Sequence, residues 1–420
     1  MKPEKIAFLL NEFPTLTETF ILNQIIFLIR QGVDVRIFAL YPGDFDRLHH
    51  QYHGYGLEHR LTTVAVLPKS YSGRLAEAWR FFRSNGFLRT LPGFLKSINP
   101  FNFGSSGLKL THFLHFTRLS TIESCELIHV HFGQVGVFLS AFTEIGLLNS
   151  IPIIVSFHGY DLVPNQYLIN RKLYRPMFRV AKALTVNSQY TGNLLNQVNP
   201  EVKSKVWLLP ESLDTKLFDR SKDEVSRVSD RNFHLVFIGR LVDWKGPDTA
   251  VMVMRHIVKE IRFSNVRLTV IGKGPMDFQL KAMVQNLGLS EYVKLLGGQE
   301  QSVVRSVLAS ADLFVYTGRE QKDTKRAENQ GLVLMEAQAM GIPVVAFDVG
   351  GVGEGVKDGV TGYLLPPGSV HEFAYQIVNL LRNEERLKEM GHASKSYVKK
   401  NYDIDVLGER LLSLYKQVVV

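Results

Sequence analysis

The chain has 420 residues, more than one hydrophobic core usually supports, so we expect two domains of about 200 residues each. Hydrophobic residues make up 45% of the chain and charged residues 21%, an ordinary soluble composition. No apolar run reaches the roughly eighteen residues that predict a membrane-spanning helix. The net charge of +9 favours an anionic partner, either a nucleic acid, a membrane surface or a phosphorylated ligand, or else only aids solubility.

Two features of the sequence predict a cytoplasmic protein, and the absence of known motifs argues against a nucleic-acid partner. The start MKPEKIAFLLNEFPTL has too short an apolar segment for a signal peptide. Cys125 is the single cysteine, which excludes an internal disulfide and suits a reducing cytoplasm. The sequence has no zinc-finger spacing, no basic helix with heptads and no aromatic RNA-binding signature, so we expect no nucleic-acid partner.

Short β-branched apolar runs alternate with longer helical patterns along the chain. The first half contains KIAFLL, VRIFAL, TTVAVL, LIHVHF, PIIVSF, ALTVNS and VWLLPE. The second half contains HLVFIG, VRLTVIG, VKLLGG, ADLFVYT and PVVAFD. Such runs, apolar on both faces and separated by helices, are typical of parallel sheets covered on both sides. The sequence therefore predicts an α/β fold of two doubly wound, Rossmann-like domains.

A polar, charged stretch from 214 to 232 separates the two halves and predicts a linker. We place an N-terminal domain at residues 1–215 and a C-terminal domain at 216–402, with a last helix at about 403–420 that packs back on the first domain. Open α/β sheets bind ligands at the carboxyl ends of their strands, so the two domains should face a central cleft. Residues just after each strand are therefore the candidates for a site.

Polar residues follow the first two predicted strands. Thr17, Glu18 and Thr19 come after the first strand, where they can cap the next helix, and nearby amides can meet a phosphate. Plain helix capping is at least as good an interpretation. Asp44 and Asp46, after the second strand, have the Asp-x-Asp spacing that can hold a divalent metal. Such pairs are common among turn residues, so we expect no metal site there.

Residues 69–118 combine basic and aromatic side chains. They contain eight Lys or Arg, one Glu and ten aromatic residues. Cations beside Trp and Phe suit an anionic membrane interface. The alternative is a set of ordinary helices whose aromatic residues lie in the core and whose cations are solvated.

Histidines follow two later strands of the first half. His129 and His131 lie in LIHVHF, and strand alternation puts both on one face, so a core position for one of them stays open. His131 is nearer the strand end and is the better cleft candidate. His158 and Asp161 follow PIIVSF and are further cleft candidates, because they also come directly after a strand.

The second half places cations and glycines after its strands. HLVFIG is followed by Arg240 and Lys245, beside Gly239, and an arginine fork plus a lysine charge can neutralise a diphosphate. Gly274 opens a helix after VRLTVIG, where a helix N-terminus admits an anion, although tight turns also need glycine. Glycines also end VKLLGG and follow PVVAFD. Four strand ends thus carry cations or glycines, which together predict one site for a nucleoside diphosphate.

Two glutamates follow the strand ADLFVYT. Glu328 ends a long polar loop, and Glu336 lies in the mostly apolar helix GLVLMEAQAM. A carboxylate is seldom buried without a partner, so Glu336 indicates a ligand such as a ribose diol or, less often, a structural ion pair. Gly331 lets backbone amides near the helix start approach a ligand.

These motifs carry a family resemblance over nearly the whole chain. Two glutamates separated by seven residues, then a strand and a glycine pair, resemble the signature of family-four retaining glycosyltransferases with the GT-B fold. GRLVDWKG is similar to the Arg…Lys pair of that family, and PESLDTKLF stands where such chains usually read NGVDTxxF. NEFPTLTETFILNQI is similar to the N-terminal stretch of bacterial exopolysaccharide transferases of the colanic acid and amylovoran type, where many relatives have a glycine-rich loop.

The resemblance implies roles for the strand-end residues. Arg240 and Lys245 would hold the diphosphate of a nucleotide-sugar, and Glu336 would hold its ribose. Glu328 would bind the transferred sugar and stabilise its developing positive charge. The further residues implied are His131 as a catalytic contact with the donor sugar, and Gly331, Leu332, Gly239 and Gly274 as donor-binding positions.

The resemblance implies a retaining, hexosyltransferase-type enzyme that needs neither a metal nor another cofactor. Its N-terminal domain would bind a glycan or lipid-linked acceptor, and its C-terminal domain a nucleotide-sugar. We expect it in the cytoplasm, peripheral on the inner face of the plasma membrane, in surface-polysaccharide assembly. Three alternatives stay open: a nucleotide-sugar epimerase of the same fold, a phosphorylase of similar fold, and a non-catalytic nucleotide-sugar-binding or membrane-scaffold protein.

Overall fold

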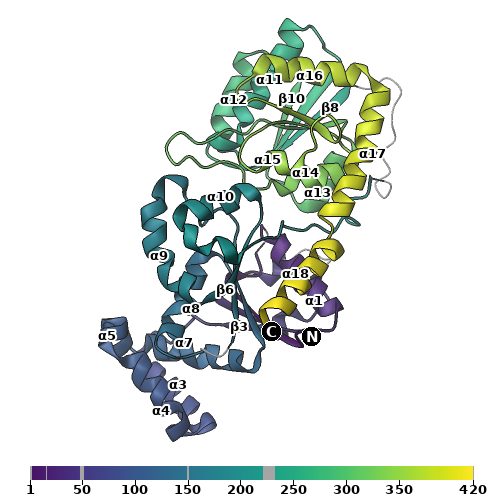
Figure 1. The fold of residues 1–420 in the computed structure, drawn as a ribbon. Helices are drawn as coiled ribbons and strands as arrows, with labels where there is room; N and C mark the ends of the chain where they lie inside the picture. Colours follow the sequence, from purple (N-terminus) through teal and green to yellow (C-terminus); the bar gives the residue numbers. More distant parts are fainter. Residues whose placement is uncertain (1, 16, 48–51, 149–150, 221–231, 420) are drawn as a thin grey trace.

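The computed structural model describes residues 2–15, 17–47, 52–148, 151–220 and 232–419, and it contains two domains, each built around one parallel sheet (Figure 1). Most of the predicted linker, residues 221–231, lies outside the described residues. The strands of the first sheet are β1 (Lys5–Phe13), β2 (Asp34–Pro42), β3 (Leu61–Thr63), β4 (Leu127–His131), β5 (Ile153–Phe157), β6 (Ala181–Val186) and β7 (Val206–Leu208). Those of the second are β8 (Phe233–Ile238), β9 (Val266–Ile271), β10 (Val293–Gly297), β11 (Leu313–Tyr316), β12 (Val344–Phe347) and β13 (Gly362–Leu365).

The first sheet has the strand order β3-β2-β1-β4-β5-β6-β7, and its pairs are parallel. Its central strands β4 and β5 are buried along their whole length, as their continuous apolar runs predict. The helices of this domain are α1 (Thr19–Arg30), α2 (Leu57–Arg60), α3 (Tyr71–Asn85), α4 (Phe87–Ile98), α5 (Pro100–Phe103), α6 (Ser105–Leu108), α7 (Thr111–Leu119), α8 (Gly133–Glu144), α9 (Tyr167–Val180) and α10 (Gln189–Val198).

The second sheet has the order β10-β9-β8-β11-β12-β13, again with parallel pairs. The sequence did not indicate β13, because its GYLL run is short and starts at a glycine. The remaining helices are α11 (Pro247–Arg255), α12 (Asp277–Asn286), α13 (Gln301–Ala309), α14 (Leu332–Ala339), α15 (Val352–Gly355), α16 (Val370–Arg382), α17 (Glu384–Asn401) and α18 (Ile404–Val419). The prediction of two doubly wound domains is confirmed.

The strand order fixes where a ligand can bind. Each sheet reverses its direction of growth once, between β1 and β4 in the first domain and between β8 and β11 in the second. The carboxyl ends of strands at such a switch point open a crevice, because the connections on either side lead away from each other. The candidate residues Thr17 and His131 therefore belong to the first crevice, and Lys245 and Glu328 to the second.

Helix α18 returns from the C-terminal domain to the N-terminal domain and lies beside α1 (Figure 1). Leu411 and Tyr415 of α18 are buried in the same cluster as Ile25 of α1. The Tyr415 hydroxyl is 2.6 Å from Nδ1 of His129 in β4. The last helix therefore ties the end of the chain to the core of the first domain.

Helices α3, α4 and α5 project from the N-terminal domain at the lower left of Figure 1. One face of this group is held by aromatic packing, in which Phe82 contacts Phe94 and Phe113 at ring-centroid distances of 5.3 and 5.4 Å. The outer face leaves other large apolar side chains exposed, including Leu88 at 83% and Phe101 at 98%. Within the described residues, no helix has the length and apolar character needed to cross a membrane.

Candidate active site

A cavity of about 260 Å³ lies between the two domains. The N-terminal domain contributes His158 and Tyr160, from the loop after β5, to its wall. The C-terminal domain contributes Arg240 and Trp244, from the loop after β8, and Asn329, from the loop after β11. The cavity is thus formed by strand ends of both sheets, as the crevice rule predicts.

Direct contacts hold the two domains together around this cavity. Glu211 and Gln330 exchange two hydrogen bonds between main chain and side chain, at 2.7 and 2.9 Å. The carboxylate of Glu354 accepts from the first two backbone N–H groups of α10, at 2.6 and 2.8 Å. Gly159 has a positive φ of 86°, and an added Cβ would lie 2.0 Å from Asn329, so a side chain there would push the domains apart.

Lys245 and Glu328 form the charged centre of the C-terminal crevice. The Lys245 ammonium donates a hydrogen bond to Oε2 of Glu328, and the Tyr316 hydroxyl donates to the same oxygen at 2.9 Å. Lys245 also lies over the Trp244 ring, with Nζ 4.4 Å from the ring centroid. The two neighbours of Glu328 in the chain, Ala327 and Asn329, both line the cavity. The carboxylate therefore lies immediately behind the cavity wall.

The surroundings of Glu328 keep its carboxylate ionised. Burial alone would raise the pKa of Glu328, since it is only 7% exposed. The charge of Lys245 and the hydrogen bonds from Lys245, Tyr316 and the Asn329 amide outweigh burial and lower the pKa. Glu328 is thus a fixed negative charge in a site with little water, where charge–charge interactions are strong.

Arg240 lies, like Lys245, in the segment after β8, and its exposed side chain lines the cavity. Its guanidinium carbon is 5.7 Å from the Trp244 ring centroid, so the aromatic ring lies beside both cations of the loop.

Two glycines predicted to bind the donor differ in the space around them. Gly239 has room for a side chain, since an added Cβ would make only ordinary contacts, the nearest at 3.7 Å. At Gly274, an added Cβ would lie 2.4 Å from the carbonyl oxygen of Leu241, so this glycine lets the two loops pack closely.

Glu336 lies on α14, as predicted, and faces the boundary between the domains. Burial raises its pKa to about 7. The carboxylate borders a cavity of about 10 Å³, shared with Thr19 and Leu332, which is about the space of one water molecule. Gly331 precedes this helix at the N-cap with a φ of 76°, and an added Cβ there would lie 3.3 Å from Cγ of Glu328, so the start of α14 lies beside that residue. A cavity of this size is too small to hold a ribose.

The structure corrects the position of His131, which was expected to face the cleft. His131 is completely buried, and its Nδ1 is 3.0 Å from Nε2 of His158. Burial, with the nearby rings of His129 and His158, lowers the pKa of His131 well below its usual value. The outer member of the pair is His158, which lines the cavity and whose Nδ1 is 2.9 Å from Oε1 of Glu211. The strand-end rule identified both histidines as candidates, but it favoured His131, which is buried, over His158, which lines the cavity.

Asp161 also departs from the expectation of a cleft residue. It is 1% exposed, and its carboxylate accepts hydrogen bonds from the backbone N–H groups of Gly133, His158 and Gly159, at 2.9, 3.2 and 3.1 Å. The first donor begins α8, just after β4, and the other two lie in the loop after β5. Asp161 therefore positions the His158 loop and does not face a ligand.

The loop after β1 ends near His158. Glu18 occupies the N-cap position of α1, but its side chain makes no capping hydrogen bond, so the capping interpretation is wrong for this residue. Burial raises the pKa of Glu18, and the charge of His158 opposes this shift. Thr17 is exposed and Thr19 is partly buried.

Asp44 and Asp46 form a turn after β2. The backbone N–H of Asp46 donates to Oδ1 of Asp44 at 3.0 Å. The Asp-x-Asp spacing is therefore explained by a local side-chain turn, in which the first aspartate caps the backbone two residues later.

Several residues of the site were not singled out from the sequence, among them Tyr316, Glu211 and Gln330. Tyr316 ends β11 and could have been found by the strand-end rule, which was applied to charged residues and glycines. Glu211 lies in the PESLDTKLF stretch and Gln330 lies between the two glutamates of the signature. Their interaction joins positions 119 residues apart, so no local pattern reveals it.

Comparison with known proteins identifies the fold and the domain that carries the charged centre. Residues 219–397 match the family described as glycosyl transferases group 1. The amylovoran biosynthesis glycosyltransferase AmsK of Erwinia amylovora is 26% identical, over 99% of this chain and 100% of its own length. The structure of Anabaena Alr3699/HepE in complex with UDP is 18% identical, covers 98% of this chain and 100% of its own, and has a TM-score of 0.72. The UDP-glucose complex of the same protein gives a TM-score of 0.70 at 19% identity, covering 98% and 99%.

The matched family domain contains Arg240, Lys245, Glu328 and Glu336, the residues on which the resemblance was based. The fold likeness extends over both domains. Residues 219–397 thus form a domain of the glycosyl transferases group 1 family, and the chain is a glycosyltransferase with the GT-B fold.

Proposed function

We propose that this glycosyltransferase transfers a hexose, with retention of configuration, from a nucleoside-diphosphate sugar to a lipid-linked glycan during exopolysaccharide or surface-polysaccharide assembly. The observation that carries the proposal is the buried, ionised Glu328 hydrogen-bonded to Lys245 behind the interdomain cavity. The similarity to an amylovoran biosynthesis enzyme along the full chain supports the polysaccharide setting. HepE complexes with UDP and UDP-glucose support a nucleoside-diphosphate donor, with UDP as the first base to test.

We propose separate tasks for the two charges of the centre. As the donor's glycosidic bond to phosphate breaks, positive charge develops on the sugar and negative charge grows on the diphosphate. In this proposal the carboxylate of Glu328 stabilises the positive charge on the sugar. Lys245 and Arg240, together with the first amides of α14, can stabilise the leaving diphosphate. Because these groups already supply positive charge, we propose a reaction that needs no metal and no further cofactor.

The opposite wall of the cavity is formed by the N-terminal domain. His158 lies there, held by Glu211 on one ring nitrogen and by His131 on the other. Two fixed partners leave this imidazole little freedom to turn, so it can contact the transferred sugar in one orientation. We propose that His158 takes the contact with the donor sugar expected of His131, and that His131 and Asp161 position it.

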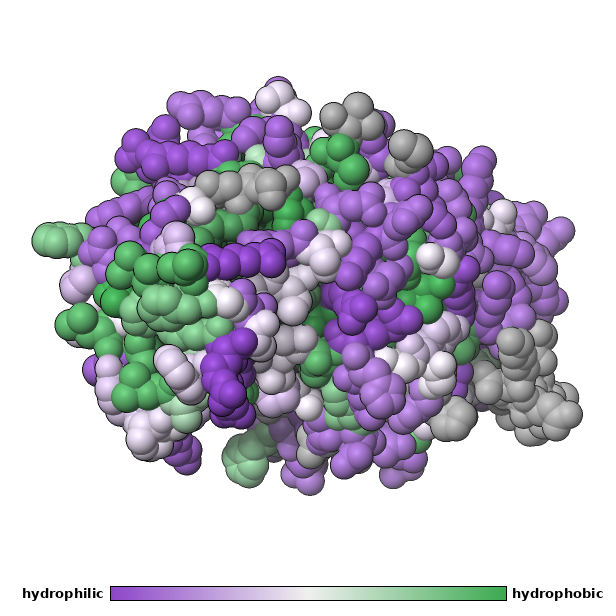
Figure 2. All heavy atoms as spheres, turned by 90° about the horizontal axis from the view of Figure 1, so that it is seen from below, coloured by the Kyte–Doolittle hydropathy of each residue, from purple (hydrophilic) through white to green (hydrophobic). Residues whose placement is uncertain are grey.

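We further propose that α3, α4 and α5 bind an anionic membrane surface from the cytoplasmic side. Figure 2 shows apolar side chains gathered at the left of the view from below, where these helices lie, with hydrophilic residues among them. Trp79 is 61% exposed and Leu88 83%, close to the exposed cations Arg83 and Arg89. Exposed aromatic and aliphatic side chains beside cations suit the headgroup region of the membrane that would hold a lipid-linked acceptor.

A thermal-shift screen with UDP-, GDP- and ADP-sugars tests the donor proposal, since a ligand that binds the native state raises its stability. One donor class should raise Tm, and the same donor should release nucleoside diphosphate when an acceptor extract is added. The variant Lys245→Ala should lose most of the shift. No stabilisation by any donor would contradict the proposal. Conversion to an epimeric nucleotide-sugar without an acceptor would favour an epimerase.

A further inference from the structure

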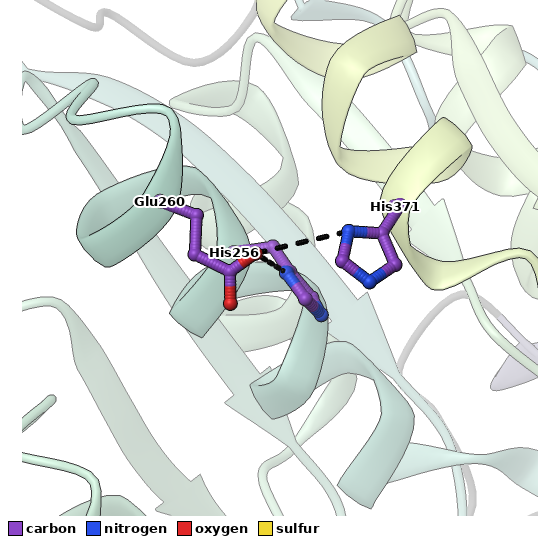
Figure 3. A group of neighbouring side chains, drawn as sticks. All are labelled: His256, Glu260 and His371. Carbon is purple, nitrogen blue, oxygen red and sulfur yellow. Dashed lines mark hydrogen bonds and ion pairs between the residues drawn. The ribbon is translucent and has the colours of Figure 1, made fainter.

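A second polar cluster lies in the C-terminal domain, outside the catalytic cleft. His256 and Glu260 belong to a single π-helical turn, His256–Glu260, that continues α11, and His371 lies in the first turn of α16. Figure 3 shows the imidazole of His371 pointing towards Glu260 and His256 from the neighbouring helix. In Figure 1, α11 and α16 lie at the end of the C-terminal domain farthest from the N-terminal domain.

The three side chains offer ligand atoms at close range. Nδ1 of His256 is 2.6 Å and Nδ1 of His371 is 3.7 Å from the same oxygen, Oε2 of Glu260. One ligand atom from each residue lies within 4.8 Å of the others. Ligands on a tetrahedral zinc ion, each about 2.0–2.2 Å from the metal, are separated by roughly 3.4 Å. The observed separations therefore bracket the separation expected between the ligands of a coordinated ion.

The environment of the cluster fits a metal better than a simple ion pair. The rings of His256 and His371 have centroids 3.9 Å apart, so both imidazoles lie together beside the one carboxylate and one ion can reach all three side chains. The other oxygen of Glu260 is held by Arg255 at 2.7 Å, which orients the carboxylate towards the histidines. A π-turn is an uncommon backbone feature that often occurs at functional sites. Here the Ile261 amide donates to the His256 carbonyl at 2.9 Å.

We propose that His256, Glu260 and His371 bind one divalent transition-metal ion, with water completing its coordination. Two imidazole nitrogens and one carboxylate are the ligands of zinc and its neighbours, whereas calcium and magnesium take oxygen ligands. The ion would join the end of α11 to the start of α16. Its task is stabilisation of this domain, because the cluster shares no residue with the walls of the cavity described above.

Titration of zinc chloride into the full-length, chelator-treated protein tests this site. Isothermal titration calorimetry should give one strong site per chain, and Tm should rise with zinc concentration. His371→Ala and Glu260→Gln change exposed side chains, so both should fold, and each should weaken zinc binding at least tenfold. His59→Ala, an exposed histidine on α2, is the matched control and should bind as the wild type does.

The visible absorption spectrum of bound cobalt(II) reports which side chains coordinate the ion. A cobalt complex with wild-type protein should absorb in the visible range, and His371→Ala should lose that absorption while keeping wild-type circular dichroism. Absence of zinc binding by the wild type would overturn the proposal and leave a hydrogen-bonded His–Glu pair. Unchanged zinc affinity in both His371→Ala and Glu260→Gln would place the ion elsewhere and overturn it equally.

Discussion

Lys245 and Glu328 are 83 positions apart in the chain, yet the lysine ammonium is hydrogen-bonded to the glutamate carboxylate. Their side chains are 15% and 9% exposed, so water screens the pair only weakly. The lysine expected to bind diphosphate is thus already held by the carboxylate expected to act on the sugar. An incoming donor can compete for Lys245 with its phosphate oxygens while Tyr316 keeps its hydrogen bond to Glu328.

Replacing Lys245 by Ala should weaken nucleoside-diphosphate binding at least tenfold and leave nucleoside binding nearly unchanged. A charge-assisted hydrogen bond contributes about 1.5–3 kcal/mol, and only the diphosphate makes it. Calorimetry with both ligands measures the difference. Lys294→Ala removes an exposed lysine from β10 and serves as the control. An equal loss of affinity for both ligands would assign Lys245 a structural task.

Glu336→Gln should make the protein more stable at pH 8 but hardly at pH 5. The folded-state pKa of about 7 lies above the ordinary glutamate value, so the folded protein binds more protons and loses stability as pH rises between the two values. Removing the carboxylate should recover on the order of 2 kcal/mol at pH 8.

Urea unfolding at both pH values checks this expectation. Glu409→Gln, an exposed position on α18, should show little change at either pH. Equal stability of wild type and Glu336→Gln at pH 8 would mean that Glu336 has a partner or water access that offsets burial.

Removal of metal ions by a chelator should affect thermal stability through the histidine cluster but should not affect catalysis. Treatment with EDTA should leave sugar transfer nearly intact, because Arg240, Lys245 and the α14 amides supply the positive charge for the diphosphate. The same treatment should lower Tm if zinc joins α11 to α16. Loss of transfer that manganese or magnesium restores would return Asp44 and Asp46 to consideration as metal ligands.

Vesicles that contain anionic lipid should bind the protein at low salt and release it at high salt. Each Lys or Arg near such a surface contributes about 1 kcal/mol, screened over about 10 Å at 0.1 M salt. Charge reversal at Arg83 and Arg89 should weaken binding tenfold or more in a flotation assay. Reversal at Lys399 and Lys400 on α17 is the matched control. Absence of binding at low salt would leave α3–α5 as ordinary domain surface.

Strand-end residues were predictable because parallel sheets bring the ends of their strands to one edge. The sequence therefore placed Arg240, Lys245 and Glu328 in one crevice before any contact was known. It could not show that Lys245 bonds to Glu328, since loop conformation decides which side chains meet. Similarly, alternation placed His129 and His131 on one face, with ring centroids 4.4 Å apart, but could not show that His158 covers His131.

Packing between distant elements accounts for the remaining differences. Asp161 has the residue type and strand-end position of a ligand-binding residue, but its carboxylate is occupied by three backbone N–H groups, one at the start of α8 and two in the loop after β5. In residues 69–118, the composition suited both a core and a membrane surface, and the structure contains both kinds of aromatic side chain: Phe82 and Phe113 are buried while Trp79 is exposed. Composition gives the number of such residues, whereas helix orientation decides which of them face solvent.

The most direct test compares the kinetics of Glu328→Gln and Glu336→Gln with the donor found in the screen. Both variants must first match the wild type in circular dichroism at the assay pH. Glu328→Gln should lower kcat and kcat/KM together, because its charge acts where the transition state develops positive charge. Glu336→Gln should mainly raise the donor KM, because ribose contacts are alike in ground and transition states. A Glu328→Gln variant with wild-type kcat, or a Glu336→Gln variant that loses kcat at unchanged donor KM, would contradict this account.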